Sequence, residues 1–233
     1  RPCLTQPRGP VVQRTCRGRL PAAGLWDRDG TLVGTGPYWI AEARGLVEKH
    51  GGAWTDEHAH QLVGHDLLDS AEYILAHSPI ELTPLEIVHE LLAGVVVRVA
   101  DHVPWRPGAR ELLEGCVALG VPCALVTMSW ESLATAVVRR LPKGSFTAVI
   151  TGDVVRHGKP HPEPYLAAVR LLGADLGACI AIEDSPPGVA SAVAAGIPTI
   201  AVPHHVTVPE TVGAVQIATL AGLEPEGLLR LVT

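Results

Sequence analysis

The chain has 233 residues, of which 47% are hydrophobic, and a formal net charge of −6. This length suits one core with a smaller appended unit, since domains run from about 50 to 250 residues. The hydrophobic content excludes a disordered chain, and no apolar run approaches the roughly 18 residues of a membrane span, so we expect a soluble protein with no membrane partner.

The first twenty residues carry five arginines and no acidic residue. Removing these five from the 18 basic residues leaves 13 against 24 acidic residues, a net charge of −11 for the remainder. Such a surface repels nucleic acid, so no nucleic-acid partner is expected. We expect residues 1–20 to form a tail outside the fold, and a targeting segment, an overextended start or an expression remnant would each account for it.

The five cysteines show no C-x-x-C pairing. Cys123 and Cys179 lie within apolar, strand-like runs, where a reduced cysteine packs as a small hydrophobic residue. The pattern favours a reducing, cytoplasmic location.

Five short apolar runs alternate with helix-length segments along the chain. The runs cover residues 22–26, 123–127, 146–151, 179–182 and 197–202. Strand-like runs that alternate with helical patterns predict βαβ units. We therefore expect a doubly wound, mainly parallel α/β sheet with a Rossmann-like core over residues 21–36 and 104–233, closed by a helix near residues 224–231.

An insertion separates the first two runs and is far too long for a βα connection, which normally takes a handful of residues. Apolar residues at three- and four-residue spacing predict helices over 38–50, 56–62, 67–76 and 84–101. Residues 34–37 and 103–108 are rich in glycine and proline and resemble paired hinges. We expect residues 37–103 to form an α-helical cap that opens and closes, and a rigid helical subdomain is the alternative.

An acidic pair follows the first run. Asp27 and Asp29 are two residues apart, and Gly30 comes next. Residues two apart leave a strand on the same side, so both carboxylates should point into one crevice, with the glycine permitting a sharp exit. An ordinary acidic turn is the alternative, because Asp-Gly also marks turns.

A second acidic pair, Glu183 and Asp184, follows the fourth run, and Ser185 is placed to cap the next helix. Ligand sites in open α/β sheets lie at such carboxyl ends. If the two strands are neighbours, four carboxylates converge, which is prohibitively repulsive without a cation. Oxygen ligands indicate Mg²⁺, whereas the pair taken alone could be a solvated loop.

Two further segments carry groups suited to phosphate. Thr127 and Met128 follow the second run just before a helix, where a hydroxyl and free amides can cradle an anion, although a hydroxyl there is also an ordinary N-cap. Lys159 is followed by a proline that keeps the backbone extended, so its side chain could reach inward. An isolated lysine is usually solvated, so its interest rests on the other motifs.

These four motifs, in this order, resemble those of the haloacid dehalogenase-like superfamily. They are Asp27-x-Asp29-Gly30-Thr31, then Thr127 after a strand, then Lys159-Pro160, then Glu183-Asp184-Ser185. The cap between the first two motifs resembles the branch that contains phosphoglycolate phosphatases, sugar-phosphate phosphatases and β-phosphoglucomutases. The resemblance covers residues 22–220.

The resemblance implies a role for each motif residue. Asp27 would be the nucleophile that accepts the phosphoryl group, and Asp29 the acid that protonates the leaving oxygen and then activates water. Thr127 and the Met128 amide would hold phosphate oxygens, and Lys159 would balance charge. Mg²⁺ would be held, directly or through water, by the Asp27 carboxylate, the Asp29 backbone carbonyl and the carboxylates of Glu183 and Asp184.

The cap segment 63–70 resembles the part that faces the substrate in this branch, which makes Gly64 and His65 candidate substrate-binding residues. In the mutases, an arginine three residues after that glycine grips the second phosphate of the substrate. This chain has Leu67 there, which favours a phosphatase, although Arg98 is a possible substitute.

Two features lie outside the motifs. Relatives usually have a small or apolar residue at the position of Arg28, and strand alternation directs this side chain away from both aspartates, so we expect a surface arginine. His58, His60 and His65 cluster in the predicted cap. Because no cysteine or other third ligand is apparent beside them, we expect no metal site there.

The sequence therefore predicts a Mg²⁺-dependent phosphatase that hydrolyses a small phosphorylated metabolite, such as a sugar or polyol phosphate, through a phospho-aspartate. A β-phosphoglucomutase-like phosphomutase is the nearest alternative. A phosphate sensor without turnover is an alternative of another class, disfavoured because every motif residue is present. A dehalogenase is disfavoured because its chemistry needs neither Asp29 nor a magnesium site.

Overall fold

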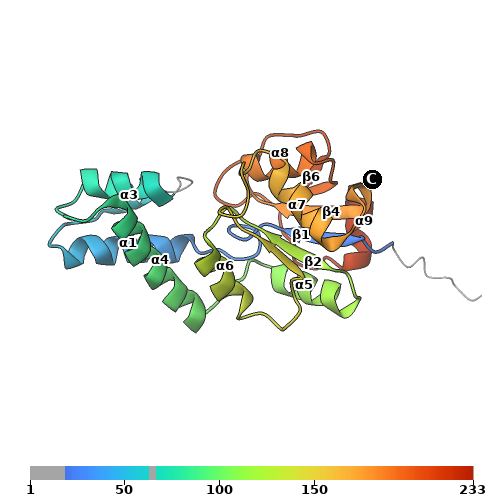
Figure 1. The fold of residues 1–233 in the computed structure, drawn as a ribbon, viewed down its shortest axis with the longest axis horizontal. Helices are drawn as coiled ribbons and strands as arrows, with labels where there is room; N and C mark the ends of the chain where they lie inside the picture. The colour runs from blue at the N-terminus through green and yellow to red at the C-terminus, as the bar shows by residue number, and fades with distance from the viewer. Residues whose placement is uncertain (1–18, 63–66, 233) are drawn as a thin grey trace, which may run out of the picture.

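A computed structural model describes residues 19–62 and 67–232, and its centre is a six-stranded parallel sheet of order β3-β2-β1-β4-β5-β6 (Figure 1). The strands are β1 (Ala23–Trp26), β2 (Cys123–Val126), β3 (Ala148–Ile150), β4 (Cys179–Glu183), β5 (Thr199–Ala201) and β6 (Ala214–Gln216). The predicted parallel α/β sheet is confirmed. Its central strands β1, β2 and β4 are buried along their whole length, as expected for a sheet covered on both faces.

The register of the three central strands brings their carboxyl ends to one level. Trp26, the last residue of β1, is opposite Leu125 of β2 and Ile182 of β4. The residues that directly follow these positions therefore meet at one edge of the sheet. This is the edge at which ligand sites form in open α/β sheets.

Helices cover both faces of the sheet (Figure 1). One face packs against α5 (Ala109–Ala118) and α6 (Glu131–Val138), and the other against α7 (Glu163–Leu172) and α8 (Pro186–Ala194). Alternate residues of each strand point to opposite faces of the sheet. Leu125 and Ile182 pack in the apolar layer that contains α5 and α6, and Leu25 packs in the layer that contains α7 and α8. This alternation is the physical basis of the two apolar layers.

In its described residues, the insertion has four helices, which extend to one side of the core (Figure 1). They are α1 (Gly36–Lys49), α2 (Asp56–Gln61), α3 (Leu67–Ala76) and α4 (Pro84–Asp101). Capping boxes at Thr55 and Thr83 begin α2 and α4. The helices enclose an apolar cluster of their own around Ile74 and Ile87.

Contacts of two kinds, between helices and between linkers, are prominent where the insertion joins the core. The second half of α4 packs against α6, so that Val95 and Val99 belong to the same apolar cluster as Leu133 and Val137. The two connecting segments also pair with each other, since Gly34 N–H donates to Pro104 O at 2.8 Å. The insertion is therefore attached by a helix contact and by a pair of adjacent linkers.

Some elements differ from the prediction. The edge strand β6, which pairs with β5, was not predicted, because it has three residues and its sequence shows no longer apolar run. The predicted closing helix is a 3₁₀ turn, Pro225–Gly227, followed by the single-turn helix α9 (Leu228–Leu231). Within the described residues, no helix is long and apolar enough to cross a bilayer. The cysteines in this part of the chain, Cys116, Cys123 and Cys179, are free and buried.

Candidate active site

Asp27 follows β1 directly and lies between the ends of the two neighbouring strands. Its backbone N–H donates to Ile182 O at 3.0 Å, which continues the ladder with β4 and fixes the position of the residue. Its side chain is nearly buried and has one oxygen bound to Lys159. The carboxylate is therefore held at the sheet edge by a rigid strand.

Lys159 reaches into the site from the segment before α7. Its Nζ donates to Asp27 Oδ1 at 2.7 Å, to Val126 O at 2.8 Å and to Glu183 Oε1. Three acceptors satisfy the three protons of an ammonium group. Burial by itself lowers the pKa of Lys159, but the attraction of Asp27 and Glu183 outweighs it, and the net pKa is raised. Lys159 therefore stays charged.

Glu183 and Asp184 come from β4 and the turn after it. Glu183 is fully buried and accepts from Tyr165 Oη at 2.6 Å as well as from Lys159. Asp184 lies against Gly30, which has a φ of +87°, and a Cβ on that glycine would be 1.9 Å from Asp184 Oδ2. Gly30 is therefore required both for its left-handed backbone and for the approach of Asp184.

Three carboxylates meet in this site. Ligand oxygens of Asp27, Glu183 and Asp184 lie within 4.8 Å of one another. With Lys159 they form a buried group of formal charge −2. Burial, followed by repulsion from Asp27, raises the pKa of Asp184, and burial also raises that of Glu183 against the opposing attraction of Lys159. An all-oxygen donor set with this excess negative charge fits Mg²⁺.

Asp29 lies outside that group of three. Its Oδ1 accepts from the Thr35 N–H at 3.0 Å and from Thr35 Oγ1 at 2.9 Å, and its side chain is partly exposed. The expected convergence of four carboxylates is therefore a convergence of three, with the fourth held beside it by the first linker. This position leaves Asp29 accessible for proton transfer.

The expectation of a surface Arg28 was wrong. Arg28 is 1% exposed, and its Nη2 donates to Ser129 Oγ at 2.6 Å and lies 3.5 Å from Asp29 Oδ2. Strand alternation does not apply here because β1 ends at Trp26 and residue 28 belongs to a turn, in which Leu32 N–H donates to Arg28 O. The guanidinium thus joins the first motif to the second.

Thr127 and Met128 lie at the end of β2, beside Lys159. The Thr127 hydroxyl accepts from Ser129 N–H at 3.1 Å, and the Lys159 N–H donates to Met128 Sδ at 3.3 Å. A cavity of about 780 Å³ adjoins this segment. The residues that line it, within the described part of the chain, are Met128, Trp130, Glu131, Ser132, Gly152, Asp153, Gly158 and Lys159. Met128 and Lys159 thus belong both to the site and to the wall of a space that can hold a small molecule, whereas the three carboxylates are not among its lining residues.

A family model described as a haloacid dehalogenase-like hydrolase matches residues 25–202. The chain belongs to this family. Hexitol phosphatase A of Escherichia coli is 32% identical over 180 residues, which covers 76% of this chain and 81% of that protein. A bifunctional riboflavin kinase/FMN phosphatase of Arabidopsis thaliana is 30% identical over 187 residues, 79% of this chain but only 49% of that protein.

A solved structure supports the same assignment. The putative β-phosphoglucomutase of Thermotoga maritima superposes with a TM-score of 0.74 at 26% identity, covering 89% of this chain and 96% of that one. The haloacid dehalogenase-like fold, including the helical insertion, therefore extends over most of the chain.

Sequence reasoning missed several residues of this haloacid dehalogenase-like site. Tyr165 is buried on α7 and binds Glu183, and Trp130, Glu131 and Asp153 line the cavity. No sequence motif surrounds these residues. Tyr165 could have been found only by noting that a tyrosine lies on the apolar, buried face of the helix that follows Lys159. Gly64 and His65 lie outside the described residues.

The cap histidines are accounted for only in part, since His65 also lies outside the described residues. The His58 ring packs at 4.8 Å from that of Trp54 and at 5.6 Å from that of His77. His58 also completes the capping box of α2 with Thr55. These contacts give His58 a structural role within the insertion.

Proposed function

We propose that this haloacid dehalogenase-like hydrolase is a Mg²⁺-dependent phosphatase that cleaves a small phosphate monoester through a phospho-aspartate at Asp27. One observation carries the proposal. The Asp27 carboxylate is fixed by Lys159 within a group of three carboxylates, and Lys159 also lines a cavity of about 780 Å³. A positioned nucleophile, a cation-demanding donor set and room for a substrate are the requirements of phosphoryl transfer.

In the first step an Asp27 oxygen attacks phosphorus while the bond from phosphorus to the leaving oxygen breaks. The leaving oxygen takes the proton of the Asp29 carboxyl group, which lies two residues after Asp27 and outside the three-carboxylate group. The alcohol departs and the phosphoryl group stays on Asp27. Lys159 keeps Asp27 in place and offsets the charge that the phosphoryl group brings.

In the second step Asp29, now a carboxylate, takes a proton from water as the water oxygen attacks phosphorus. The bond between phosphorus and Asp27 breaks, inorganic phosphate leaves, and Asp29 is again protonated. Thr35, which binds Asp29 Oδ1 through both its amide and its hydroxyl, fixes the orientation of this group for both steps.

The Mg²⁺ ion would be held by Asp27, Glu183 and Asp184, with the Asp29 backbone carbonyl as a further ligand. When bound, it would offset negative charge on the phosphoryl oxygens. Tyr165 and Lys159 would keep Glu183 oriented toward it, in the way that outer contacts usually orient metal ligands.

The walls of the cavity favour a leaving group without a second negative charge. Glu131 and Asp153 contribute acidic side chains and Trp130 an aromatic surface. Carboxylates accept hydrogen bonds from hydroxyl groups but repel a second phosphate. A sugar or polyol monophosphate fits this lining, in agreement with the hexitol phosphatase relative.

The cytoplasm remains the location that we propose for the protein.

A phosphomutase is the second candidate, because a putative β-phosphoglucomutase shares the fold. The two residues on which the choice depends favour hydrolysis. Leu67 packs partly buried against the apolar cluster of the insertion, and Arg98 is paired with Glu42. Neither side chain is thus held ready for a second phosphate.

The proposal is tested by assaying release of inorganic phosphate from a panel of phosphate monoesters, with Mg²⁺ and with excess chelator. We expect hydrolysis of sugar or polyol monophosphates only with Mg²⁺. Asp27→Asn should lower kcat by about a thousandfold or more, because an amide cannot form the acyl phosphate. Asp101→Asn, at an exposed position on α4, is the control. Binding of phosphate esters without turnover would instead support the sensor.

A further inference from the structure

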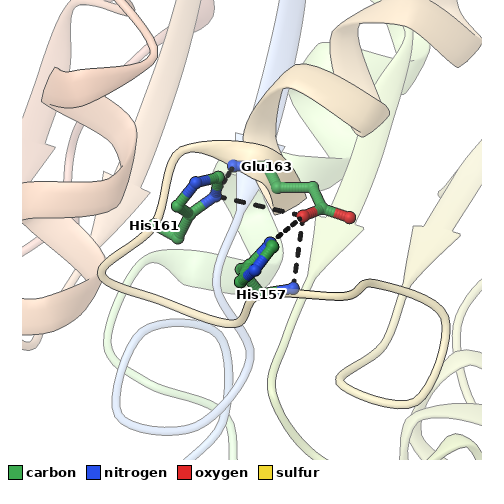
Figure 2. A group of neighbouring side chains, drawn as sticks. All are labelled: His157, His161 and Glu163. Atoms are coloured by element: carbon green, nitrogen blue, oxygen red, sulfur yellow. Dashed lines mark hydrogen bonds and ion pairs between the residues drawn. The ribbon is translucent and has the colours of Figure 1, made fainter.

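A second group of potential metal ligands lies outside the site described above. His157, His161 and Glu163 meet on the segment before α7 and at its first residue (Figure 2). Both imidazole rings turn toward the Glu163 carboxylate, and their centroids are 4.7 Å apart. The two histidines stand two residues before and two residues after Lys159.

The distances within this group are close to those of a metal centre. His157 Nδ1 lies 2.9 Å and His161 Nδ1 lies 4.0 Å from Glu163 Oε2. A tetrahedral ion with bonds of about 2.0–2.1 Å holds its donor atoms roughly 3.3 Å apart. The two observed distances bracket this value, and the three donor atoms lie within 4.8 Å of one another, so that side-chain rotations could bring them around one ion.

Helix capping explains only part of the arrangement. Glu163 accepts from the backbone N–H groups of Arg156 and His157 and from the His157 ring, which accounts for the positions of these residues at the start of α7. His161 is not needed for this, since its Nδ1 is too far from the carboxylate for a hydrogen bond. Its contact there is the Glu163 N–H at 3.2 Å, which a metal ion would replace.

The chemistry of the donors selects the ion. Two imidazoles and one carboxylate suit Zn²⁺ and related transition metals, whereas Mg²⁺ prefers oxygen donors. The side chains of His157, His161 and Glu163 are 63%, 50% and 30% exposed. An ion can therefore enter from solvent and keep one position for water.

We propose that His157, His161 and Glu163 form a site for one transition-metal ion of the zinc class, separate from the carboxylate site at Asp27. The ion would bind one residue on each side of Lys159 and link both of them to Glu163 in the first turn of α7. His161 is already anchored to the neighbouring helix, because Ser191 Oγ donates to His161 O at 2.6 Å. Occupation would thus fix the segment from which Lys159 reaches the site.

The test is a calorimetric titration of the full chain with Zn²⁺ in the presence of saturating Mg²⁺. We expect one Zn²⁺ site that is retained in Asp184→Asn, where the carboxylate site is weakened. His157→Gln and His161→Gln should each weaken this site by about tenfold to a hundredfold, and the double variant should lose it. His102→Gln, at an exposed histidine outside the group, is the matched control and should bind as the wild type does.

Co²⁺ provides an independent readout, because its visible absorption is much stronger in a four-coordinate site than in a six-coordinate, all-oxygen site. We expect absorption bands in the wild type and in His102→Gln but not in His157→Gln/His161→Gln. Circular dichroism without metal shows whether the double variant is folded. A folded double variant that binds Zn²⁺ with the stoichiometry and affinity of the wild type would overturn the proposal, as would loss of the site in Asp184→Asn.

Discussion

At the residue scale, Arg28 combines full burial of a charge with few hydrogen bonds. Its side chain is fully buried, yet its Nε and Nη1 have no hydrogen-bond partner within the described part of the chain. A buried cation is destabilising unless it is paired and its donors are satisfied. Its contacts with Ser129 and Asp29 connect two motif segments, which gives a functional reason for keeping it.

Replacing Arg28 should therefore move stability and activity in opposite directions. We expect Arg28→Met to raise the free energy of unfolding by about 1 kcal/mol, because the buried charge is removed while most of the volume is kept. The value of kcat should fall about tenfold, because Asp29 and Ser129 lose their common partner. Denaturant unfolding and steady-state kinetics measure the two effects.

The control is Arg140→Met, which removes an exposed arginine from the segment after α6. It should leave both quantities within error of the wild type. An Arg28→Met protein that is less stable and fully active would show that the arginine has a purely structural role.

At the scale of elements, the loop after β5 packs against the first linker. A Cβ on Gly34 would lie 3.7 Å from His204 Cε1, and one on Gly36 would lie 3.3 Å from His205 Nε2. The two glycines thus leave room for a pair of histidines. His204 Nδ1 is buried and has no hydrogen-bond partner among the described residues.

This environment predicts a pH-dependent stability. Burial, followed by repulsion from Arg106, lowers the pKa of His204 to about 4, against an ordinary value of 6.5. Below pH 6.5 the unfolded chain binds this proton more readily than the folded one, so stability should fall as the pH decreases toward 4. Above pH 6.5 the histidine is neutral in both states and contributes no slope.

The measurement compares the free energy of unfolding at pH 7 and pH 4.5 for the wild type and His204→Gln. We expect the fall to be smaller in the variant by about 1 kcal/mol, a value reduced for partial solvent screening. In His205→Gln only a smaller cause of the lowered pKa of His204 is removed, so most of the wild-type fall should remain. Equal slopes in the wild type and His204→Gln would contradict this assignment.

At the scale of the whole molecule, the insertion is attached to the core at the paired linkers and through α4. Val95 and Val99 of α4 pack with Leu133 of α6, while the linkers pair through an antiparallel bridge between Val33 and Trp105. We propose that the insertion acts as a cap that pivots on these paired linkers. Closure would exclude water from the leaving group.

The choice between phosphatase and mutase depends on whether the insertion and the core bind a second phosphate, at the end of the substrate away from the reacting one. We expect that a hexose 1-phosphate supplied with its 1,6-bisphosphate as primer yields inorganic phosphate. Leu67 offers no charge-assisted hydrogen bond, and Glu131 and Asp153 repel a second phosphate, so a bisphosphate should not be retained. Accumulation of hexose 6-phosphate with little free phosphate would establish the mutase instead.

The sequence alone predicted the features that depend on near neighbours along the chain. The four bounds of α3 and α4 match the expected ranges, and the chain order of strands and helices yields the parallel sheet. The convergence of Asp27, Glu183 and Asp184 was also predictable, because each carboxylate directly ends or follows a buried strand and parallel strands end at the same edge.

Only the tertiary structure decided which of these groups pair. It placed Arg28 in the interior, turned Asp29 to Thr35 and brought Tyr165 to Glu183. These contacts join segments across turns and between elements, where neither strand alternation nor helical spacing applies. Distances between atoms from different elements depend on how the elements pack, and no local pattern encodes that packing.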